Sequence, residues 1–173
     1  MVIIPTTQAI HLAKKLRGVK KFRIIVPGLN RDGKRYFPDG EIYAKIPQAS
    51  SLKGARVIVL HTGQPHPNEG LVELELILQI LKSAQVKNLE VFFSYFPYGM
   101  QDKVFEKGEV NAAENLVEKL VTYYLVKKIY IIDAHFPGEK WVKKYPLRMI
   151  SALPLLHNAV QRDFGHHIFF CSP

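Results

Sequence analysis

An α/β protein with a doubly wound, mainly parallel sheet is expected from this sequence, for two reasons. Residues 56–60, R-V-I-V-L, form an apolar run of β-branched character, which is typical of a strand covered on both faces. Runs of this kind then alternate with helical patterns along the rest of the chain. In such sheets ligands bind beyond the carboxyl ends of the strands, so functional residues are sought there.

The chain before residue 56 combines one helix with short extended pieces. Thr6 or Thr7 can cap the helix, the following apolar residues share one face, and Gly18 stops it. The tetrapeptide N-R-D-G at 30–33 is a strong turn signal. We therefore expect a helix that ends at Leu16, a strand over 22–26, a turn at 30–33 and an extended piece over 41–46.

A helix expected over residues 68–84 is almost wholly apolar. Its polar residues Glu75, Gln79 and Lys82 make one narrow stripe, so two of its sides should be buried. One side would face its own sheet, and the other could contact another subunit. The remaining expected elements are a strand over 89–93, a helix over 111–124, a strand over 129–132, a helix over 153–160 and a strand over 168–171.

Composition narrows the classes of function. The 173 residues include 24 Lys and Arg against 15 Asp and Glu, a net charge of +9 that favours an anionic partner. The excess lies near the start, because residues 1–45 hold ten basic and three acidic side chains. No RNP, KH or helix-turn-helix pattern accompanies this basic run, so a solvated face or an anionic metabolite is favoured over nucleic acid.

The single cysteine and the hydropathy pattern bear on location. Cys171 cannot form an intrachain disulfide, which favours a reducing compartment. The apolar start at residues 2–4 is too short for a signal peptide, and no apolar run approaches the ~18 residues of a membrane span. We therefore expect a soluble cytoplasmic protein without membrane contact.

Phosphate chemistry in this chain would need a site without the common glycine motifs, because the sequence holds neither a P-loop nor a dinucleotide fingerprint. Three loops are candidates. In the first, Phe37 lies beside Asp39 and Glu41, and an aromatic ring with two carboxylates suits an adenine-type ligand. The alternative is a surface turn whose acids are solvated.

The other two candidate loops follow expected strands. Residues 95–103, Y-F-P-Y-G-M-Q-D-K, crowd three aromatics beside a polar triplet, although aromatics after a strand can simply cover the core. Asp133 and His135 follow the strand over 129–132, and on extended chain their side chains would project to the same side and could hold a divalent cation. The alternative is a carboxylate that orients a structural histidine.

The remaining histidines carry less information. His61 and His66 are separated by a proline-containing loop, and His166 and His167 are adjacent, so neither pair has the spacing of a closed zinc site. We interpret them as loop or strand-edge residues.

Together these loops resemble the N-terminal half of ribose-phosphate pyrophosphokinases, the phosphoribosyl diphosphate synthetase family, from about residue 35 to residue 173. Residues 35–41, R-Y-F-P-D-G-E, are similar to the family's R-F-x-D-G-E. Residues 95–103 look like its Y-F-G-Y-A-R-Q-D-R, and D-A-H at 133–135 looks like its D-L-H. Further matches in the same order are 67–74 with P-T-N-x-x-L-M-E-L, 151–156, and S-P at 172–173 with the start of S-P-D.

The resemblance implies tandem phosphoribosyltransferase-type, Rossmann-like domains in a homo-oligomer whose dimers build hexamers. It implies transfer of the diphosphoryl group of ATP, with Mg²⁺ as cofactor, to the C1 hydroxyl of ribose 5-phosphate, which gives phosphoribosyl diphosphate and AMP. The implied ATP-binding residues are Phe37, Asp39, Gly40 and Glu41, which reach the adenine of a neighbouring subunit, and Met100, Gln101 and Asp102; the implied metal-binding residues are Asp133 and His135.

Two departures from the family limit what this chain should do alone. Met100 replaces the family's arginine in Y-A-R-Q-D, so a cation expected near the ATP phosphates is missing. The family's second half, which carries the catalytic basic loop and the ribose-phosphate loop, is absent. We therefore expect residues 1–150 to form the ATP-binding domain and residues 151–173 to begin a truncated or missing C-terminal domain, and we expect this segment to be inactive alone.

Two other functions stay open. The chain could be a degenerate, non-catalytic regulatory relative that binds synthetase subunits, which is the function that Met100 favours. It could also be an oligomerising nucleotide-binding module of unrelated role.

Overall fold

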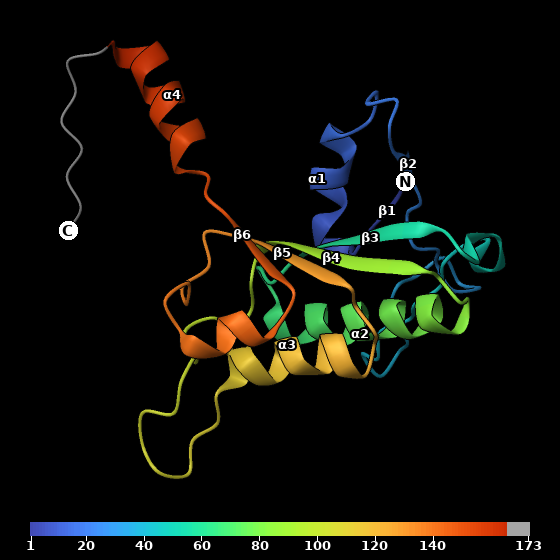
Figure 1. The fold of residues 1–173 in the computed structure, drawn as a ribbon. Helices are drawn as coiled ribbons and strands as arrows, with labels where there is room; N and C mark the ends of the chain where they lie inside the picture. The colour runs from blue at the N-terminus through green and yellow to red at the C-terminus, as the bar shows by residue number, and fades with distance from the viewer. Residues whose placement is uncertain (166–173) are drawn as a thin grey trace.

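The computed structural model describes residues 1–165 (Figure 1). The strand expected over 168–171, with Cys171, His166, His167 and the S-P at 172–173, lies outside the described residues. The elements are β1 (Val2–Pro5), η1 (Thr7–Ala9), α1 (Ile10–Lys15), β2 (Arg23–Ile24), η2 (Ala49–Leu52), β3 (Arg56–Thr62), α2 (Pro67–Ser83), β4 (Asn88–Tyr95), α3 (Ala112–Thr122), β5 (Lys128–Ile132), η3 (Lys140–Lys144), β6 (Leu147–Ile150) and α4 (Leu153–Phe164).

Within residues 1–165, six parallel strands form one sheet in the order β2-β1-β3-β4-β5-β6. Helix α1 covers one face of this sheet, and α2 and α3 cover the other (Figure 1). The doubly wound parallel α/β fold expected from the sequence is therefore confirmed. The strand order reverses between β1 and β3, which is where folds of this kind open a crevice at the carboxyl ends of their strands.

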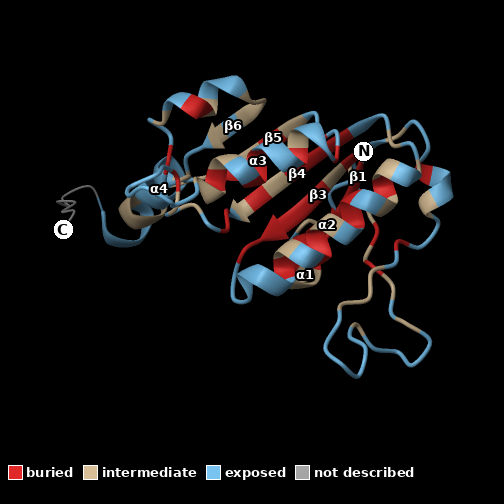
Figure 2. Cartoon of the chain, turned by 90° about the horizontal axis from the view of Figure 1, so that it is seen from below, coloured by how far each residue is buried: buried red, intermediate tan, exposed pale blue. Residues whose placement is uncertain are grey.

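The hydrophobic core is divided by the sheet into a larger and a smaller cluster. On the larger side, α2 buries Leu74, Ile77, Leu78 and Leu81 against the sheet. Under α1 lies a smaller cluster that includes Ile3, Ala9, Ala13 and Leu60. Figure 2 shows the central strands β3 and β4 as mainly buried, the edge strand β6 as only partly buried, and the outer surfaces of the helices as mainly exposed. Burial on both faces explains why the run at 56–60 is continuously apolar instead of alternating.

The expected helices are present, with small shifts at their ends. The expectation of two buried sides for the helix at 68–84 is confirmed only for the side that faces the sheet. On its outer side Val72 is 51% exposed and Leu76 is 38% exposed. Contact of this outer side with another subunit stays a prediction.

Several elements differ from the expectation. The structure adds β1 and β6, which the sequence pattern did not indicate. The extended piece expected over 41–46 does not join the sheet: it forms an isolated antiparallel bridge between Tyr36 and Ile42, and the carbonyl of Lys45 accepts from the amide of Gly28 at 2.7 Å. A two-residue β2 replaces the strand expected over 22–26.

Helix α4 stands away from the body of the molecule (Figure 1). None of its residues is buried, and Leu153, Leu155, Leu156 and Phe164 are between 58% and 78% exposed. The domain division at 150/151 is compatible with this placement and stays a prediction. Within the described residues, none of the helices has both the length and the hydropathy of a membrane-spanning segment.

Candidate functional site

The first candidate loop is a tight hairpin closed between Tyr36 and Ile42. The amide of Phe37 donates to the carbonyl of Glu41 at 2.8 Å, and the amide of Gly40 donates back to the carbonyl of Phe37 at 3.0 Å. Gly40 has a φ of 91°, a left-handed conformation that glycine adopts without strain. The turn therefore depends on the glycine of P-D-G-E and presents the residues around it to solvent.

The side chains of this hairpin are arranged for access. Phe37 is 43% exposed, and its ring meets Tyr43 edge-on at 5.8 Å between centroids, so its faces are not stacked on Tyr43. The carboxylate of Asp39 accepts from the amide of Glu41 at 3.1 Å. An open cavity of about 460 Å³ lies against the residues Asp32, Lys34, Arg35, Tyr36, Phe37 and Pro38. The cavity is large enough for a nucleobase, although Asp39, Gly40 and Glu41 do not line it.

The second candidate loop leaves β4 through a left-handed residue. Tyr98 has a φ of 58°, and its hydroxyl contacts the side-chain oxygen of Asn68 at the start of α2. Its carbonyl accepts from the amide of Gln101 at 3.2 Å, which closes a turn around Met100. Met100 is thereby left 68% exposed.

The end of this turn is anchored to the core. Asp102 is buried, and its carbonyl accepts from Nε1 of Trp141 at 2.9 Å. The carbonyl of Gln101 accepts from the amide of Ala113 in the first turn of α3 at 3.1 Å. Met100 and Gln101 are therefore held on a turn fixed at both ends, whereas Asp102 faces the protein interior.

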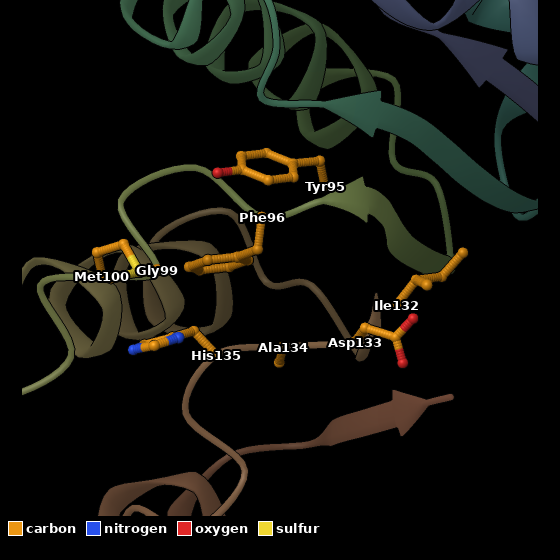
Figure 3. Close-up of a pocket in the computed structure, with 8 residues that line it drawn as sticks. All are labelled: Tyr95, Phe96, Gly99, Met100, Ile132, Asp133, Ala134 and His135. Carbon is orange, nitrogen blue, oxygen red and sulfur yellow. The ribbon is translucent and has the colours of Figure 1, made fainter. Parts of the chain in front are cut away.

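The third candidate loop follows β5. Asp133 has a φ of 41°, so the chain is left-handed there and not extended. Its amide donates to the carbonyl of Ile150 at 2.9 Å, and its carboxylate accepts from the amide of Ala152 at 3.1 and 3.3 Å. In Figure 3 the side chains of Asp133 and His135 point in opposite directions. The expectation that the side chains of Asp133 and His135 project to the same side is therefore wrong.

These two strand ends border one small cavity of about 70 Å³ (Figure 3). From the β4 side it is lined by Tyr95, Phe96, Gly99 and Met100, and from the β5 side by Ile132, Asp133, Ala134 and His135. Its lining contains no lysine or arginine. Nucleotide pockets are several times larger, so this cavity could take one ligand group at most. Among the described residues, no three His, Cys, Asp or Glu side chains are grouped closely enough to hold a metal ion alone.

The structure does not bring the predicted residues into one cavity. Phe37 lines the larger cavity, Met100, Asp133 and His135 line the smaller one, and the two share no residue. Both loops are nevertheless tied to the start of α2. The hydroxyl of Tyr36 lies 3.4 Å from the carboxylate of Glu69, and Tyr98 contacts the adjacent Asn68. Burial and the charge of Glu69 raise the pKa of Tyr36, which keeps this hydroxyl protonated as a donor.

Sequence reasoning missed a buried polar network at the ends of β1 and β3. Glu73 of α2 accepts from the amide of Thr7 at 2.9 and 3.0 Å and from its hydroxyl at 2.6 Å. The one available signal was that Glu73 lies outside the polar stripe of its helix. This network ties the start of η1 to α2 beside the reversal of strand order.

His61 belongs to the same region and corrects an expectation. It lies inside β3 and is fully buried, not at a loop or strand edge. Its Nδ1 is 3.0 Å from the hydroxyl of Thr6, while its Nε2 and the Oε1 of Gln8 have no hydrogen-bond partner in the described part of the chain. Burial lowers the pKa of His61 to about 4, so the ring is neutral at pH 7.

Comparisons with known proteins agree on one family. A family model described as the N-terminal domain of ribose phosphate pyrophosphokinase matches residues 2–124. A ribose-phosphate pyrophosphokinase of Pyrococcus furiosus is 31% identical over 142 residues, which are 82% of this chain and 47% of that protein. The enzyme of the same name from Fusobacterium nucleatum is 31% identical over 120 residues, 69% of this chain and 37% of the relative.

A solved structure agrees with the sequence comparisons. The crystal structure of phosphoribosylpyrophosphate synthetase from Mycobacterium smegmatis superposes with a TM-score of 0.79 at 20% identity, over 94% of this chain and 52% of the other. At that identity the likeness establishes the fold, which is of the phosphoribosyltransferase type. The chain spans less than half the length of the two curated relatives described above.

Proposed function

This chain belongs to the ribose-phosphate pyrophosphokinase family, and we propose that it is the ATP- and Mg²⁺-binding half of a ribose-phosphate diphosphokinase. The complete enzyme would transfer the diphosphoryl group of ATP to the C1 hydroxyl of ribose 5-phosphate and release AMP. The observation that carries the proposal is that two exposed ligand loops, around Phe37 and Met100, are both anchored to the start of α2.

The residues of the first loop would bind adenine. A half-exposed ring such as Phe37 offers a face for stacking, and Asp39 and Glu41 offer acceptors for the exocyclic amine. Gly40 would permit the turn that presents them. Because this loop shares no cavity with Met100 in one chain, the proposal includes a homo-oligomer in which the loop serves a neighbouring subunit.

The second and third loops would face the phosphates. Met100 and Gln101 lie on the anchored turn, and the buried Asp102 would fix the end of that turn. Phosphoryl transfer relies on positioning and on neutralisation of charge, and the protein itself need form no covalent bond. Groups held on fixed turns suit that task better than mobile side chains do.

The donor set at the end of β5 fits Mg²⁺ only together with substrate. Mg²⁺ is commonly held by one or two protein side chains and completed by water and phosphate oxygens. Asp133 and His135 are the residues here that would contribute, although both oxygens of the Asp133 carboxylate already accept from the amide of Ala152. Bound Mg²⁺ would neutralise charge on the transferred phosphates.

Calorimetric titration with Mg-ATP tests the adenine assignment. We expect Phe37→Ala to weaken binding about five-fold in the assembled oligomer, the loss of one ring contact. Phe164→Ala, which removes a more exposed ring from α4, 78% exposed against 43% for Phe37, is the control and should bind as the wild type does. Sedimentation of both variants establishes that assembly is unchanged. Equal ATP affinity for Phe37→Ala and wild type would remove the adenine assignment.

A non-catalytic regulatory role is a second candidate, and one observation favours it. No basic side chain lines the cavity beside Met100, where the resemblance places an arginine. A Met100→Arg variant separates the two roles. In a working ATP site the new cation should tighten Mg-ATP binding, whereas a subunit that has lost its nucleotide role should bind neither form and still associate with active synthetase subunits.

A further inference from the structure

The positive charge of this chain lies mainly at the amino edge of the sheet, which we define as the segments 17–23, 53–56, 82–88 and 123–128 that lead into β2, β3, β4 and β5. These segments contain ten basic residues and no acidic one. The basic residues are Arg17, Lys20, Lys21, Arg23, Lys53, Arg56, Lys82, Lys87, Lys127 and Lys128.

At the opposite edge, the loops after β3, β4 and β5, which hold the Met100 and Asp133 candidates, have the reverse balance. The loops 62–66, 96–111 and 133–139 that follow β3, β4 and β5 contain two basic and five acidic residues. The net charge of +9 is therefore not explained by the loops after these strands. A second anionic partner at the amino edge would explain it, because parallel strands place all these segments side by side.

A cavity of about 260 Å³ opens at the amino edge between the end of α2 and the starts of β4 and β5. Lys82, Lys87 and Lys127 line it together with the apolar side chains of Val86, Leu89 and Leu125. Leu125 is 50% exposed. This lining suits a ligand that places an apolar group against Val86, Leu89 and Leu125 and carboxylates near the surrounding amines.

The three amines are not equally available. Nζ of Lys82 donates to the carbonyl of Tyr123 at 2.6 Å and lies 4.3 Å from the centre of the Tyr123 ring. The amine of Lys82 therefore already satisfies a backbone carbonyl of this chain, and we do not count it as available to a partner. The side-chain amines of Lys87 and Lys127 make no hydrogen bond or ion pair with any residue from 1 to 165, although the backbone amide of Lys127 donates to the carbonyl of Leu89. Their charges are available to a partner.

Two features favour an acidic peptide over nucleic acid. Binding of single strands uses exposed aromatic faces on which bases stack, and here Nζ of Lys82 lies over one face of Tyr123, which leaves less aromatic surface for a base. The cavity is also smaller than the ~300–1,000 Å³ of pockets that enclose whole small ligands, but it is ample for one apolar side chain.

We propose that the amino edge is a docking surface for an acidic segment of a partner protein, which places one apolar side chain in this cavity and carboxylates on Lys87 and Lys127. The site is remote from the candidate nucleotide loops, so the proposal stands whether or not the chain binds ATP.

Fluorescence anisotropy with defined peptides tests the proposal on the full chain. The probe is a labelled peptide with four glutamates on each side of one phenylalanine, and the comparison peptide has only glutamates. We expect the phenylalanine peptide to bind more tightly, and Lys87→Glu with Lys127→Glu to weaken it about ten-fold at low salt. Leu125→Asn should weaken only the phenylalanine peptide. Asparagine tolerates the left-handed conformation of residue 125, whose φ is 60°.

The control is Lys107→Glu with Lys140→Glu, which changes the net charge equally at exposed positions away from the amino edge. An equal loss with this control would show attraction by net charge only and would overturn the proposal. The absence of peptide binding would overturn it too. Tighter binding of a single-stranded RNA, lost in the Lys87 and Lys127 variant, would replace the acidic peptide by nucleic acid.

Discussion

Asp133 and His135 are two residues apart, yet their side chains lie in different environments. The amide and carboxylate of Asp133 bond to the end of β6 and the start of α4, while His135 is exposed beside the small cavity. The D-x-H pattern could identify the place, because it follows a strand. It could not identify the backbone conformation, because β6 itself was not evident from L-R-M-I at 147–150.

His135→Ala tests the proposed metal role at this strand end. If His135 contributes to Mg²⁺ binding, the variant should need more Mg²⁺ than the wild type does to bind ATP. The Mg²⁺ concentration at which its ATP affinity is half-maximal should be several-fold higher than that of the wild type. His11→Ala removes another exposed histidine, on α1, and serves as the control. The measurement is ATP binding by calorimetry across a Mg²⁺ series. Superimposable Mg²⁺ curves for His135→Ala and wild type would contradict the role.

His61 makes stability depend on pH. Its pKa is about 4 in the fold and about 6.5 in the unfolded chain, so below pH 6.5 the unfolded state binds the proton first. Stability is therefore complete above pH 6.5 and falls as the pH drops toward 4, by about 3 kcal/mol in total. Urea unfolding at pH 7, 5.5 and 4.5 measures the loss. His61→Leu should lose less stability over this range, and an identical loss in both proteins would refute the assignment.

At the scale of elements, the apolar periodicity of the sequence was sufficient to predict the helices and strands that pack regularly. The helices α2 and α3 and the strands β3, β4 and β5 each bury an apolar pattern long enough to be recognised. The short β1 was missed, because three apolar residues before a proline do not distinguish a strand from a coil. Its neighbours β2 and β3 make it a strand, and that pairing is non-local.

The candidate loops were found by residue type, but what holds them was not. The exposed Tyr98 hydroxyl reaches Asn68, 30 positions earlier, and Tyr36 reaches Glu69, 33 positions later. Such contacts depend on how α2 is placed over the sheet. A single sequence carries no sign of that placement, which is why the anchoring of both loops to α2 could not be predicted.

Gly63→Ala tests how the end of β3 positions the β4 loop. A Cβ at residue 63 would lie 2.8 Å from Cβ and 2.9 Å from the backbone nitrogen of Pro97, closer than packed atoms tolerate. Since backbone must move, we expect a loss of about 1–3 kcal/mol in the free energy of unfolding and weaker Mg-ATP binding through the displaced Met100 turn. Gly138→Ala meets no atom within 4 Å and is the control in urea unfolding. If Gly63→Ala were as stable as the wild type, Pro97 would move aside at no cost and the expected steric conflict would be refuted.

At the scale of the whole molecule, the sheet and its flanking helices form one packed body, and α4 is not part of its core. The described part of the chain before residue 151 holds both core clusters. Helix α4 instead carries apolar side chains that are exposed, on a segment joined to the body through the Asp133–Ala152 contact. This is the arrangement expected if residues 1–150 fold as a unit and the apolar side chains of α4 pack against something outside that unit.

Removal of residues 151–173 tests that division directly. Because α4 buries none of its residues, the chain 1–150 should unfold cooperatively in urea with a free energy within about 1 kcal/mol of the full chain. The small expected loss comes from the Ala152 amide, whose departure leaves the exposed Asp133 carboxylate to water. Leu155→Ser in the full chain is the matched control, since it removes one exposed apolar side chain without shortening the chain, and it should also leave stability unchanged. Loss of the cooperative transition in 1–150, with Leu155→Ser unaffected, would place the helix in the same folding unit as the sheet and would move the domain boundary beyond residue 150.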